Sequence, residues 1–341
     1  MLLKAYPKIN LYLHITGTEQ INSQRYHLLR SRFVRVEGAL YDEIAITPAQ
    51  GQGAESSDIV QGNFPCAIEE SSVYRALHAL RMIDGVRFPP VHIEVCKHIP
   101  SGAGLGGGSA DAGVVLRALI KRYGEGFKGA GAQLYRALFG DCADCSGRGK
   151  VDSKDIESKT ADSASALSPA IALAKGLGAD VAFFLQDLAC AEVSGIGERI
   201  APCEPALQDI SCFELYTPEI FCDTTRVYRQ YSAMINAGEL CFDTQELDTL
   251  PSSAILGVES SVDFGVRSAQ NLATLNALYR PACVLYPELA DVQKQLGAGW
   301  YFSGSGSSFF RPIMDSTQSR GNSPQQSAHI DSAMSCPGAR P

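Results

Sequence analysis

The sequence predicts an α+β fold. Segments with the two-residue period of strands and segments with helical spacing follow one another without the strict strand–helix–strand repetition of a parallel α/β protein. The chain has 341 residues, of which 45% are hydrophobic, so it can fill one large core or two smaller ones. One loop between a predicted strand and a predicted helix is unusually rich in glycine, and it is the first candidate for a functional site.

The first third of the chain supplies the regular elements behind this prediction. In residues 8–15, KINLYLHI, hydrophobic and polar side chains alternate, which predicts a strand with one polar face available for function. Residues 71–83 place hydrophobic side chains at helical spacing, and residues 91–96, VHIEVC, alternate again as a strand. From Ala112 onward helical spacing returns, which predicts a helix directly after the glycines.

Two stretches are predicted to lack regular structure. Residues 124–168 are rich in Gly, Ser, Asp and Lys and have little sustained period, so we expect a flexible insertion there. Residues 313–341 are polar and aperiodic, which predicts a disordered tail.

Composition excludes several classes of function. The formal net charge is −8 and no dense block of Lys or Arg occurs, which argues against nucleic-acid binding. No hydrophobic stretch approaches the length of a membrane span, and the N-terminus lacks the features of a signal peptide, so we expect no membrane association and a cytoplasmic location. The 11 cysteines are scattered rather than arranged as a disulfide framework, and we expect them to be reduced.

The glycine-rich loop, SGAGLGGGS at residues 101–109, has the character of an anion site. Glycines let the main chain turn tightly and bring backbone N–H groups against a ligand. The first turn of a helix adds unpaired N–H groups and the positive end of the helix dipole, so a phosphate fits at this point. Ser109 can add its hydroxyl to the phosphate or to the shell of a bound metal.

Other phosphate-loop motifs match less well. A Walker A loop that begins at Gly102 has Gly108 where its lysine should stand. Gly102, Gly104 and Gly107 satisfy the dinucleotide spacing GxGxxG, but the expected acidic residue about 20 positions later is missing. No protein-kinase motif follows the loop. A loop that is glycine-rich for packing reasons alone remains the structural alternative.

Three ordered motifs resemble the superfamily of galactokinase, homoserine, mevalonate and phosphomevalonate kinases. They are YPKINLYLHI at residues 6–15, IPSGAGLGGGSADA at 99–112 and YFSGSGSSFF at 301–310. RYH at 25–27 and LGADVAFF at 177–184 are similar to motifs of the branch that acts in non-mevalonate isoprenoid biosynthesis. The resemblance covers roughly residues 1–312, with 124–168 as an insertion.

The resemblance implies a two-domain α+β kinase with its active site in the cleft between the domains. Residues 1–200 would form the ATP-binding and catalytic domain, and residues 201–312 the substrate-binding domain. The implied reaction is ATP-dependent phosphorylation of a hydroxyl of a small-molecule acceptor, a cytidine diphosphate-linked methylerythritol. Mg²⁺ is expected because the phosphates of ATP need neutralisation during transfer. The acting unit would be a monomer or a homodimer.

The resemblance also implies roles for particular residues. Asp180 would accept the proton of the attacking hydroxyl, and Lys8 would keep that carboxylate ionised and offset charge on the phosphoryl group. Asn10 would bind the phosphates of the substrate, and Tyr26, His27 and, opposite them, Tyr228 would form the cytosine pocket. The residues implied to bind ATP are Pro100, Gly102, Gly104, Leu105, Gly106, Gly107, Gly108, Ser109 and Ala110. No residue is assigned as a metal ligand.

Without the resemblance, more ordinary roles would be favoured. An isolated Asp after a glycine usually lies in a turn or caps a helix, a Lys beside a strand is usually solvated, and a single His usually lies on the surface or in the core. Lys97 is expected to add to the positive field around the phosphates. Cys142 and Cys145 form an isolated CxxC, which we interpret as incidental because no second pair accompanies it.

Some positions depart from the pattern of the branch. Arg25 stands where a glycine is usual, Ala182 replaces a proline, and Ser71 replaces an asparagine in the predicted adenine-side helix. Two alternatives therefore stay open: another small-molecule kinase of the superfamily, of the homoserine or mevalonate type, and a nucleotide-binding protein without turnover.

Overall fold

The computed structural model describes most of the chain between residues 1 and 314. The described residues are 1–21, 24–49, 57–140, 172–174, 176–178, 180–203, 210–245, 247–248, 250, 252–256 and 274–314. Most of the predicted insertion, with its CxxC, and all but the first two residues of the predicted tail lie outside them. Among the residues that are described, no helix has both the length and the hydrophobicity to cross a membrane.

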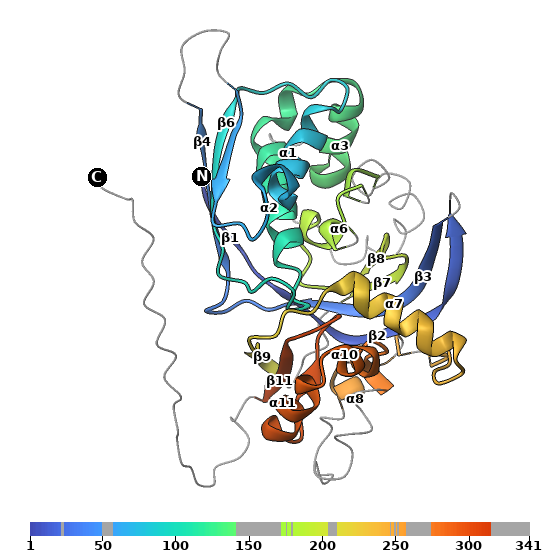
Figure 1. Ribbon diagram of the computed structural model, residues 1–341. Helices are drawn as coiled ribbons and strands as arrows, with labels where there is room; N and C mark the ends of the chain where they lie inside the picture. The colour runs from blue at the N-terminus through green and yellow to red at the C-terminus, as the bar shows by residue number, and fades with distance from the viewer. Residues whose placement is uncertain are drawn as a thin grey trace.

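A four-stranded sheet with helices on one face forms the first part of the fold (Figure 1). Its strand order is β1-β4-β6-β5, with β5 parallel to β6 and the other pairs antiparallel. The helices bury their hydrophobic faces against it in one core, together with part of the second sheet. The elements are β1 (Leu2–Ala5), β4 (Asp42–Pro48), β5 (Ile59–Gly62), β6 (Val91–Cys96), η1 (Ile68–Glu70), α1 (Ser72–Arg81), α2 (Gly107–Tyr123), η2 (Gly124–Gly126), α3 (Gly129–Phe139) and α6 (Val181–Leu185).

Helix α1 and strand β6 confirm the predictions made from spacing. Helix α1 buries Val73, Ala76, Leu77 and Leu80, and the Ser71 side chain caps it by accepting a hydrogen bond from the Tyr74 amide. Strand β6 has alternately buried and more exposed residues, as its sequence predicts. In sequence, β6 precedes the glycine-rich loop and α2 follows it.

The second sheet has the order β2-β3-β7-β8 and is antiparallel throughout. Its strands are β2 (Lys8–Ile21), β3 (Gln24–Arg35), β7 (Cys190–Gly195) and β8 (Arg199–Pro202). The prediction of a strand at residues 8–15 is confirmed, but both of its faces are buried. The polar face is covered by neighbouring elements: Tyr12 donates to Glu192 at 2.6 Å, and the His14 ring contacts the Thr274 carbonyl at 2.8 Å.

The third part of the fold contains the remaining elements. A three-stranded sheet has the order β10-β11-β9, and the helices described in this part of the chain pack near it and against β2 in a second core. In Figure 1, β9, β11, α8, α10 and α11 lie below β2, on the side away from α1 and α2, whereas α7 is drawn across the second sheet. The elements are β9 (Ile210–Tyr216), α7 (Thr224–Asn236), α8 (Ser252–Leu256), α10 (Tyr279–Leu285), α11 (Glu288–Leu296), β10 (Tyr301–Phe302) and β11 (Phe309–Met314).

A buried arginine network ties the second sheet to this third part. Arg32, on β3, forms an ion pair with Glu192 and donates to the Ser252 hydroxyl at 3.0 Å and to the Asp248 carbonyl at 3.1 Å. Its side chain is 5% exposed, so these bonds replace the water it loses.

Three predicted boundaries need correction. The predicted insertion at 124–168 begins with two regular elements, η2 and α3. Helix α3 contains the LYRALF segment and buries Leu134 in the first core. A domain boundary after residue 200 would cut β8, which pairs with β7 through Pro202. The predicted tail begins inside β11, since Ile313 and Met314 pair with β9.

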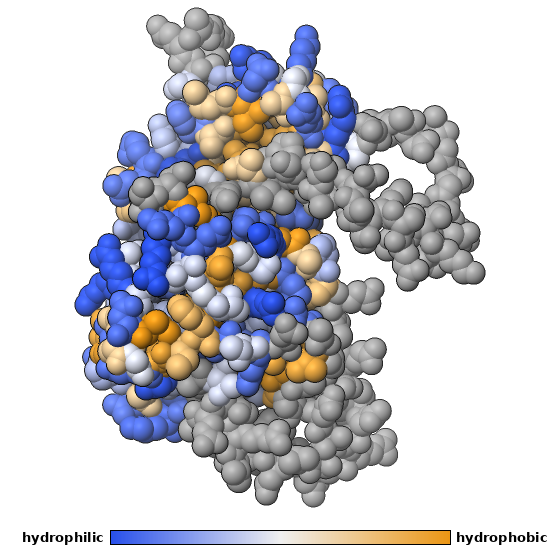
Figure 2. All heavy atoms as spheres, turned by 90° about the vertical axis from the view of Figure 1, so that its right-hand side faces the viewer, coloured by the Kyte–Doolittle hydropathy of each residue, from blue (hydrophilic) through white to orange (hydrophobic). Residues whose placement is uncertain are grey.

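The surface agrees with a fold that buries its hydrophobic residues in these two cores. On the face shown in Figure 2, hydrophobic and hydrophilic side chains are interspersed among the coloured atoms. The largest fully buried side chains include Tyr12, Tyr231, Phe183 and Phe302, which come from both cores. The elements that border the two cores, β2 and the glycine-rich loop, also carry the candidate site.

Candidate functional site

A cavity of about 580 Å³ lies where the glycine-rich loop meets β2, β3 and α7. Every predicted site residue lines it except Ala110. Ala110 is fully buried, and its amide already donates to the Gly106 carbonyl within α2 at 2.8 Å, so it cannot reach a ligand. The prediction that Ala110 binds the nucleotide is therefore wrong.

The glycine-rich loop ends in the first turn of α2. The helix begins at Gly107, earlier than the sequence predicts, and Gly106 precedes it at φ 69° with no side-chain cap. The N–H groups of a helix's first turn have no partner within the helix, and here the residues of that turn line the cavity. This arrangement, together with the dipole of a 17-residue helix, presents a phosphate with several donors and positive potential.

A second glycine-rich segment, at residues 303–308, supports the loop from behind. A Cβ at Gly104 would lie 2.2 Å from the Ser303 carbonyl oxygen, and the φ of Gly104 is +71°, so only glycine fits there. The Ser303 hydroxyl donates to the Gly104 carbonyl at 3.2 Å, and the Ser308 amide donates to the Ala103 carbonyl at 3.1 Å. The third sequence motif thus holds the second one in place.

Lys8 and Asp180 meet beside the loop. The Lys8 Nζ is 3.5 Å from Asp180 Oδ2, and the Lys8 backbone N–H donates to the Leu105 carbonyl at 3.0 Å. Lys8 is only 4% exposed, unlike the solvated lysine that is usual beside a strand. Asp180 occupies the N-cap position of α6, yet its carboxylate makes no capping bond and faces Lys8 instead. Asp180 therefore has the position of a helix cap without the capping bond, and Lys8 is not the solvated lysine of the ordinary role.

Asn10 holds Lys8 in this position. The Lys8 ammonium donates to Asn10 Oδ1 at 2.6 Å and to the Gly104 carbonyl at 3.1 Å. Asn10 Nδ2 in turn donates to the Ser31 hydroxyl at 2.8 Å. Because both ends of the Asn10 side chain have partners, its geometry favours orienting Lys8, and contact with substrate phosphates stays a prediction.

Lys97 was predicted to add to the positive field around the phosphates, but its surroundings oppose this. It forms ion pairs with the buried carboxylates of Asp42 and Asp111, the latter at 2.6 Å, so its charge is already balanced. Burial disfavours the Lys97 ammonium, but attraction to Asp111 and Asp42 outweighs it and raises the pKa. Burial, helped by the nearby Asp42, raises the pKa of Asp111 to about 8 although Lys97 opposes this.

An aromatic group forms the other end of the cavity. The rings of His27 and Tyr228 have centroids 5.2 Å apart, and His27 also contacts the hydroxyl of Ser232 at 2.9 Å. Tyr26 is 37% exposed on the same strand as His27. Burial, and then the charge of Arg25, lower the pKa of His27. Burial, and then the charge of Asp180, raise the pKa of Tyr228.

Several cavity residues were not found from the sequence. Ser31 is identified as a site residue by its hydrogen bond to Asn10. The pairing of β2 with β3 brings these two residues together. The hydroxyls of Thr224 and Ser305 lie 2.8 Å apart on the cavity wall and join the start of α7 to the second glycine-rich segment. The SGSGSS sequence at 303–308 could have indicated that Ser305 belongs to the site, whereas no local sequence pattern indicates Ser31.

Comparisons with known proteins agree in both sequence and fold. Residues 71–140 match the family model described as the GHMP kinases N terminal domain. A protein of Sulfurimonas denitrificans named 4-diphosphocytidyl-2-C-methyl-D-erythritol kinase is 32% identical over 320 residues, which cover 91% of this chain and 96% of that protein. A Helicobacter pylori protein of the same name is 29% identical over 91% of this chain and 93% of its own length.

Solved structures are also similar to this fold, and two of them illustrate the range. A crystal structure of 4-(cytidine 5'-diphospho)-2C-methyl-D-erythritol kinase is 28% identical and has a TM-score of 0.56, covering 92% of this chain and 90% of that one. The Methanococcus jannaschii mevalonate kinase is 11% identical and has a TM-score of 0.50, covering 93% and 92%. At that identity the second similarity concerns the fold alone.

Proposed function

Because the chain belongs to the 4-diphosphocytidyl-2-C-methyl-D-erythritol kinase family, we propose that it uses ATP to phosphorylate a hydroxyl of that cytidine diphosphate-linked alcohol. The reaction belongs to non-mevalonate isoprenoid precursor biosynthesis. The observation that carries the proposal is the Lys8–Asp180 pair, 3.5 Å apart, beside the open N-terminus of α2. A carboxylate base, a neighbouring ammonium charge and a phosphate cradle on one cavity wall are parts that phosphoryl transfer to an alcohol can use.

Asp180 is the proposed proton acceptor. Its side chain is 26% exposed and makes no helix-capping bond, so the carboxylate is free to accept a hydroxyl proton in the cavity. As the acceptor oxygen forms its bond to phosphorus, the proton passes to Asp180, and the bond to the leaving phosphate oxygen breaks. A positioned base of this kind contributes about 10²–10⁴-fold to the rate.

Lys8 is proposed to act through its charge. The ammonium is 3.5 Å from Asp180, and from this place it can stabilise negative charge on the phosphoryl group. Asn10 and the Gly104 carbonyl hold the Lys8 ammonium in place, so the ammonium loses little orientational entropy during the reaction. The Gly106–Ser109 turn would hold the phosphates of ATP.

Mg²⁺ is the proposed partner of ATP. Magnesium typically uses few protein ligands and completes its shell with substrate phosphates and water. The Ser109 hydroxyl, on the cavity wall in the first turn of α2, fits such a shell as an oxygen ligand next to the phosphate cradle. When bound, the ion would neutralise charge on the phosphates of ATP.

The cytidine end of the substrate is proposed to bind between β3 and α7. Tyr26 and His27 come from the strand, and Tyr228 comes from the helix, so both parts of the fold would contribute to this pocket. Aromatic rings that line a cavity offer stacking surfaces for a base. Arg25, which replaces a glycine usual in this branch, also lines the cavity and is a candidate contact for the substrate.

The test combines an acceptor panel with one substitution. Purified protein is assayed with ATP, Mg²⁺ and, in turn, 4-diphosphocytidyl-2-C-methyl-D-erythritol, homoserine and mevalonate. We expect turnover with the first acceptor only; phosphorylation of homoserine or mevalonate instead would reject the proposed substrate.

Asp180→Asn tests the proposed chemistry. We expect kcat to fall by about 10²–10⁴-fold, while nucleotide affinity, measured by calorimetry, stays near that of the unchanged protein. Unchanged turnover would remove Asp180 from the mechanism. Asp187→Asn, at an exposed carboxylate after the same helix, is the control and should leave kcat unaltered.

A further inference from the structure

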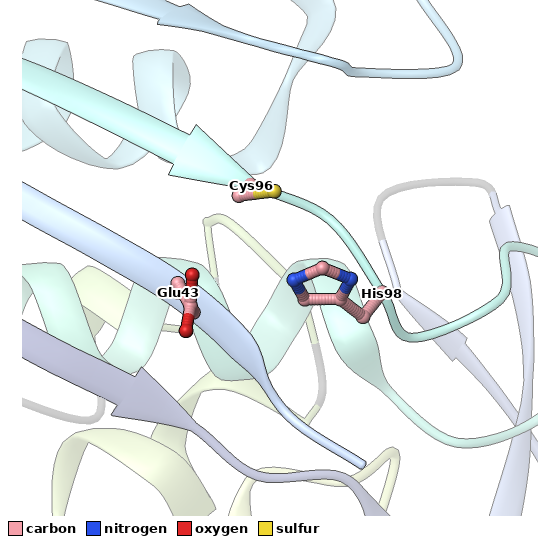
Figure 3. A group of neighbouring side chains, drawn as sticks. All are labelled: Glu43, Cys96 and His98. Carbon is pink, nitrogen blue, oxygen red and sulfur yellow. The ribbon is translucent and has the colours of Figure 1, made fainter. Parts of the chain in front are cut away.

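Three side chains of types that can bind a metal ion lie together on the outer face of the first sheet, near the end of β6 that leads to the glycine-rich loop. Glu43 is on β4, Cys96 ends β6, and His98 follows two residues later (Figure 3). Side chains alternate between the faces of a strand, so Glu43 points away from the core that its neighbour Asp42 faces. The kinase site described above uses none of the three.

The geometry suits a single metal ion. One candidate ligand atom from each residue lies within 4.8 Å of the other two. Ligand atoms around tetrahedral zinc lie about 3.3–3.8 Å apart, as bond lengths of about 2.0–2.3 Å require. Glu43 and His98 are exposed, so small rotations of their side chains can close the remaining distance.

The backbone holds the three residues in place before any ion binds. Glu43 and Cys96 are directly opposite each other in the antiparallel β4–β6 pair. The His98 and Ile99 amides both donate to Asp42 Oδ1, at 2.5 and 2.8 Å, which fixes the segment carrying His98 against the start of β4. Ligands on a fixed backbone lose little entropy when they bind.

We propose that Glu43, Cys96 and His98 form a Zn²⁺ site with a water molecule in the fourth position. A thiolate, an imidazole and a carboxylate are the ligand types that zinc takes, whereas magnesium and calcium prefer oxygen alone. On binding, the Cys96 thiol gives up its proton to solvent and its sulfur bonds the ion.

A nearby lysine is the main competing cation. Lys4 lies opposite Glu43 on β1, so its ammonium could compensate the same carboxylate. The Lys4 Nζ, however, lies over the Tyr41 ring, 4.0 Å from the centroid, and no ion pair within 4.0 Å joins it to Glu43 in the described part of the chain. The hydrogen bond of Lys4 to Tyr41 is the largest of the causes that raise the pKa of Lys4, and the charge of Glu43 is the smallest, so the lysine competes only weakly with an ion.

Zinc at this site would join β4 to the end of β6, from which the glycine-rich loop starts. The ion would therefore stabilise the folded chain and raise its melting temperature. The inference does not depend on the proposed kinase reaction, because it concerns residues outside the cavity.

Cobalt(II) is the spectroscopic probe for the test. The full chain is titrated with Co²⁺ under reducing conditions, and Zn²⁺ is then added as a competitor. We expect a sulfur-to-cobalt charge-transfer band from one cysteine and visible bands of a tetrahedral ion, both removed by Zn²⁺. Absence of the charge-transfer band in the unchanged protein would overturn the proposal.

Substitutions assign the signal to the three residues. Cys96→Ser should abolish the charge-transfer band, and Glu43→Gln and His98→Asn should each weaken Zn²⁺ binding by at least about tenfold. Cys66→Ser and Glu94→Gln, at an exposed cysteine and at an exposed glutamate of β6, are the controls and should leave binding unchanged. Equal losses in the controls, or binding retained in all three ligand variants, would refute the site.

Thermal melting without metal checks that each variant folds. If Cys96→Ser unfolds, the exposed Glu43 and His98 variants still decide the outcome through the Zn²⁺-dependent shift of Tm. We expect that shift in the unchanged protein and its loss in the two variants.

Discussion

Gly106→Ala tests the geometry on which the phosphate cradle and the reacting pair both depend. Gly106 has φ +69°, in the left-handed region that favours glycine. A Cβ at this position would lie 3.2 Å from Lys8 Cε and 3.3 Å from Asp180 Oδ2, closer than ordinary van der Waals contact. The added methyl group therefore strains the backbone and pushes on both members of the pair.

The two effects have different magnitudes. Placing alanine in the left-handed region costs about 1–2 kcal/mol of folding free energy. Lys8 and Asp180 must each move by a few tenths of an ångström to make room, and misplacement by about 1 Å can cost about 100-fold in rate. We therefore expect kcat/KM to fall about tenfold or more, with a modest loss of stability.

Gly238→Ala is the matched control. Gly238 has φ +73°, but a Cβ there would meet nothing within 4 Å. It should cost similar folding free energy, measured by urea unfolding, and leave kcat/KM unchanged in the kinase assay with 4-diphosphocytidyl-2-C-methyl-D-erythritol as acceptor. The reasoning would be refuted if Gly106→Ala kept full activity, or if both variants lost activity equally.

Two further predictions concern stability. His27 has a pKa below its ordinary value of 6.5, because burial and then Arg25 disfavour its charged form, so the unfolded chain takes up the proton first on acidification. Unfolding free energy should thus fall as the pH drops through 6.5, and His27→Gln should flatten this slope in urea titrations at several pH values; an unchanged slope would contradict the assignment. Arg32→Met should cost about 3 kcal/mol, because it removes the cationic partner of the largely buried Glu192 carboxylate, which keeps only a neutral hydrogen bond from the Tyr12 hydroxyl. A loss below 1 kcal/mol in the same unfolding assay, about the value of an exposed ion pair, would show that the network contributes little.

The sequence predicts those parts of the fold whose signals are local. Helix α1 and strand β6 follow from the spacing of hydrophobic residues, and the loop at 101–109 follows from its glycines. The motifs also identify Lys8 and Asp180, which are 172 positions apart and yet form an ion pair. That pairing could be expected only from the resemblance, since no local pattern connects the two residues.

Other features depend on contacts that no local pattern encodes. The polar face of β2 is buried with Tyr12 bonded to Glu192 and the His14 ring in contact with the Thr274 carbonyl, and the sequence of β2 carries no sign of those distant partners. The ion pairs of Lys97 could not be predicted, because Asp42 is 55 positions away in sequence and Asp111 lies on helix α2. Helix α3 was missed because its short hydrophobic run lies in a stretch with the composition of a loop.

The contact between Gly104 and residues 303–306 has a consequence for the order of events during protein synthesis. The nucleotide loop is translated in the first third of the chain, but the backbone that supports it emerges only about 200 residues later. A ribosome-bound intermediate, or a product shortened before residue 300, should therefore have its first sheet and α2 but no supported loop. Premature termination would then yield a polypeptide that cannot consume ATP.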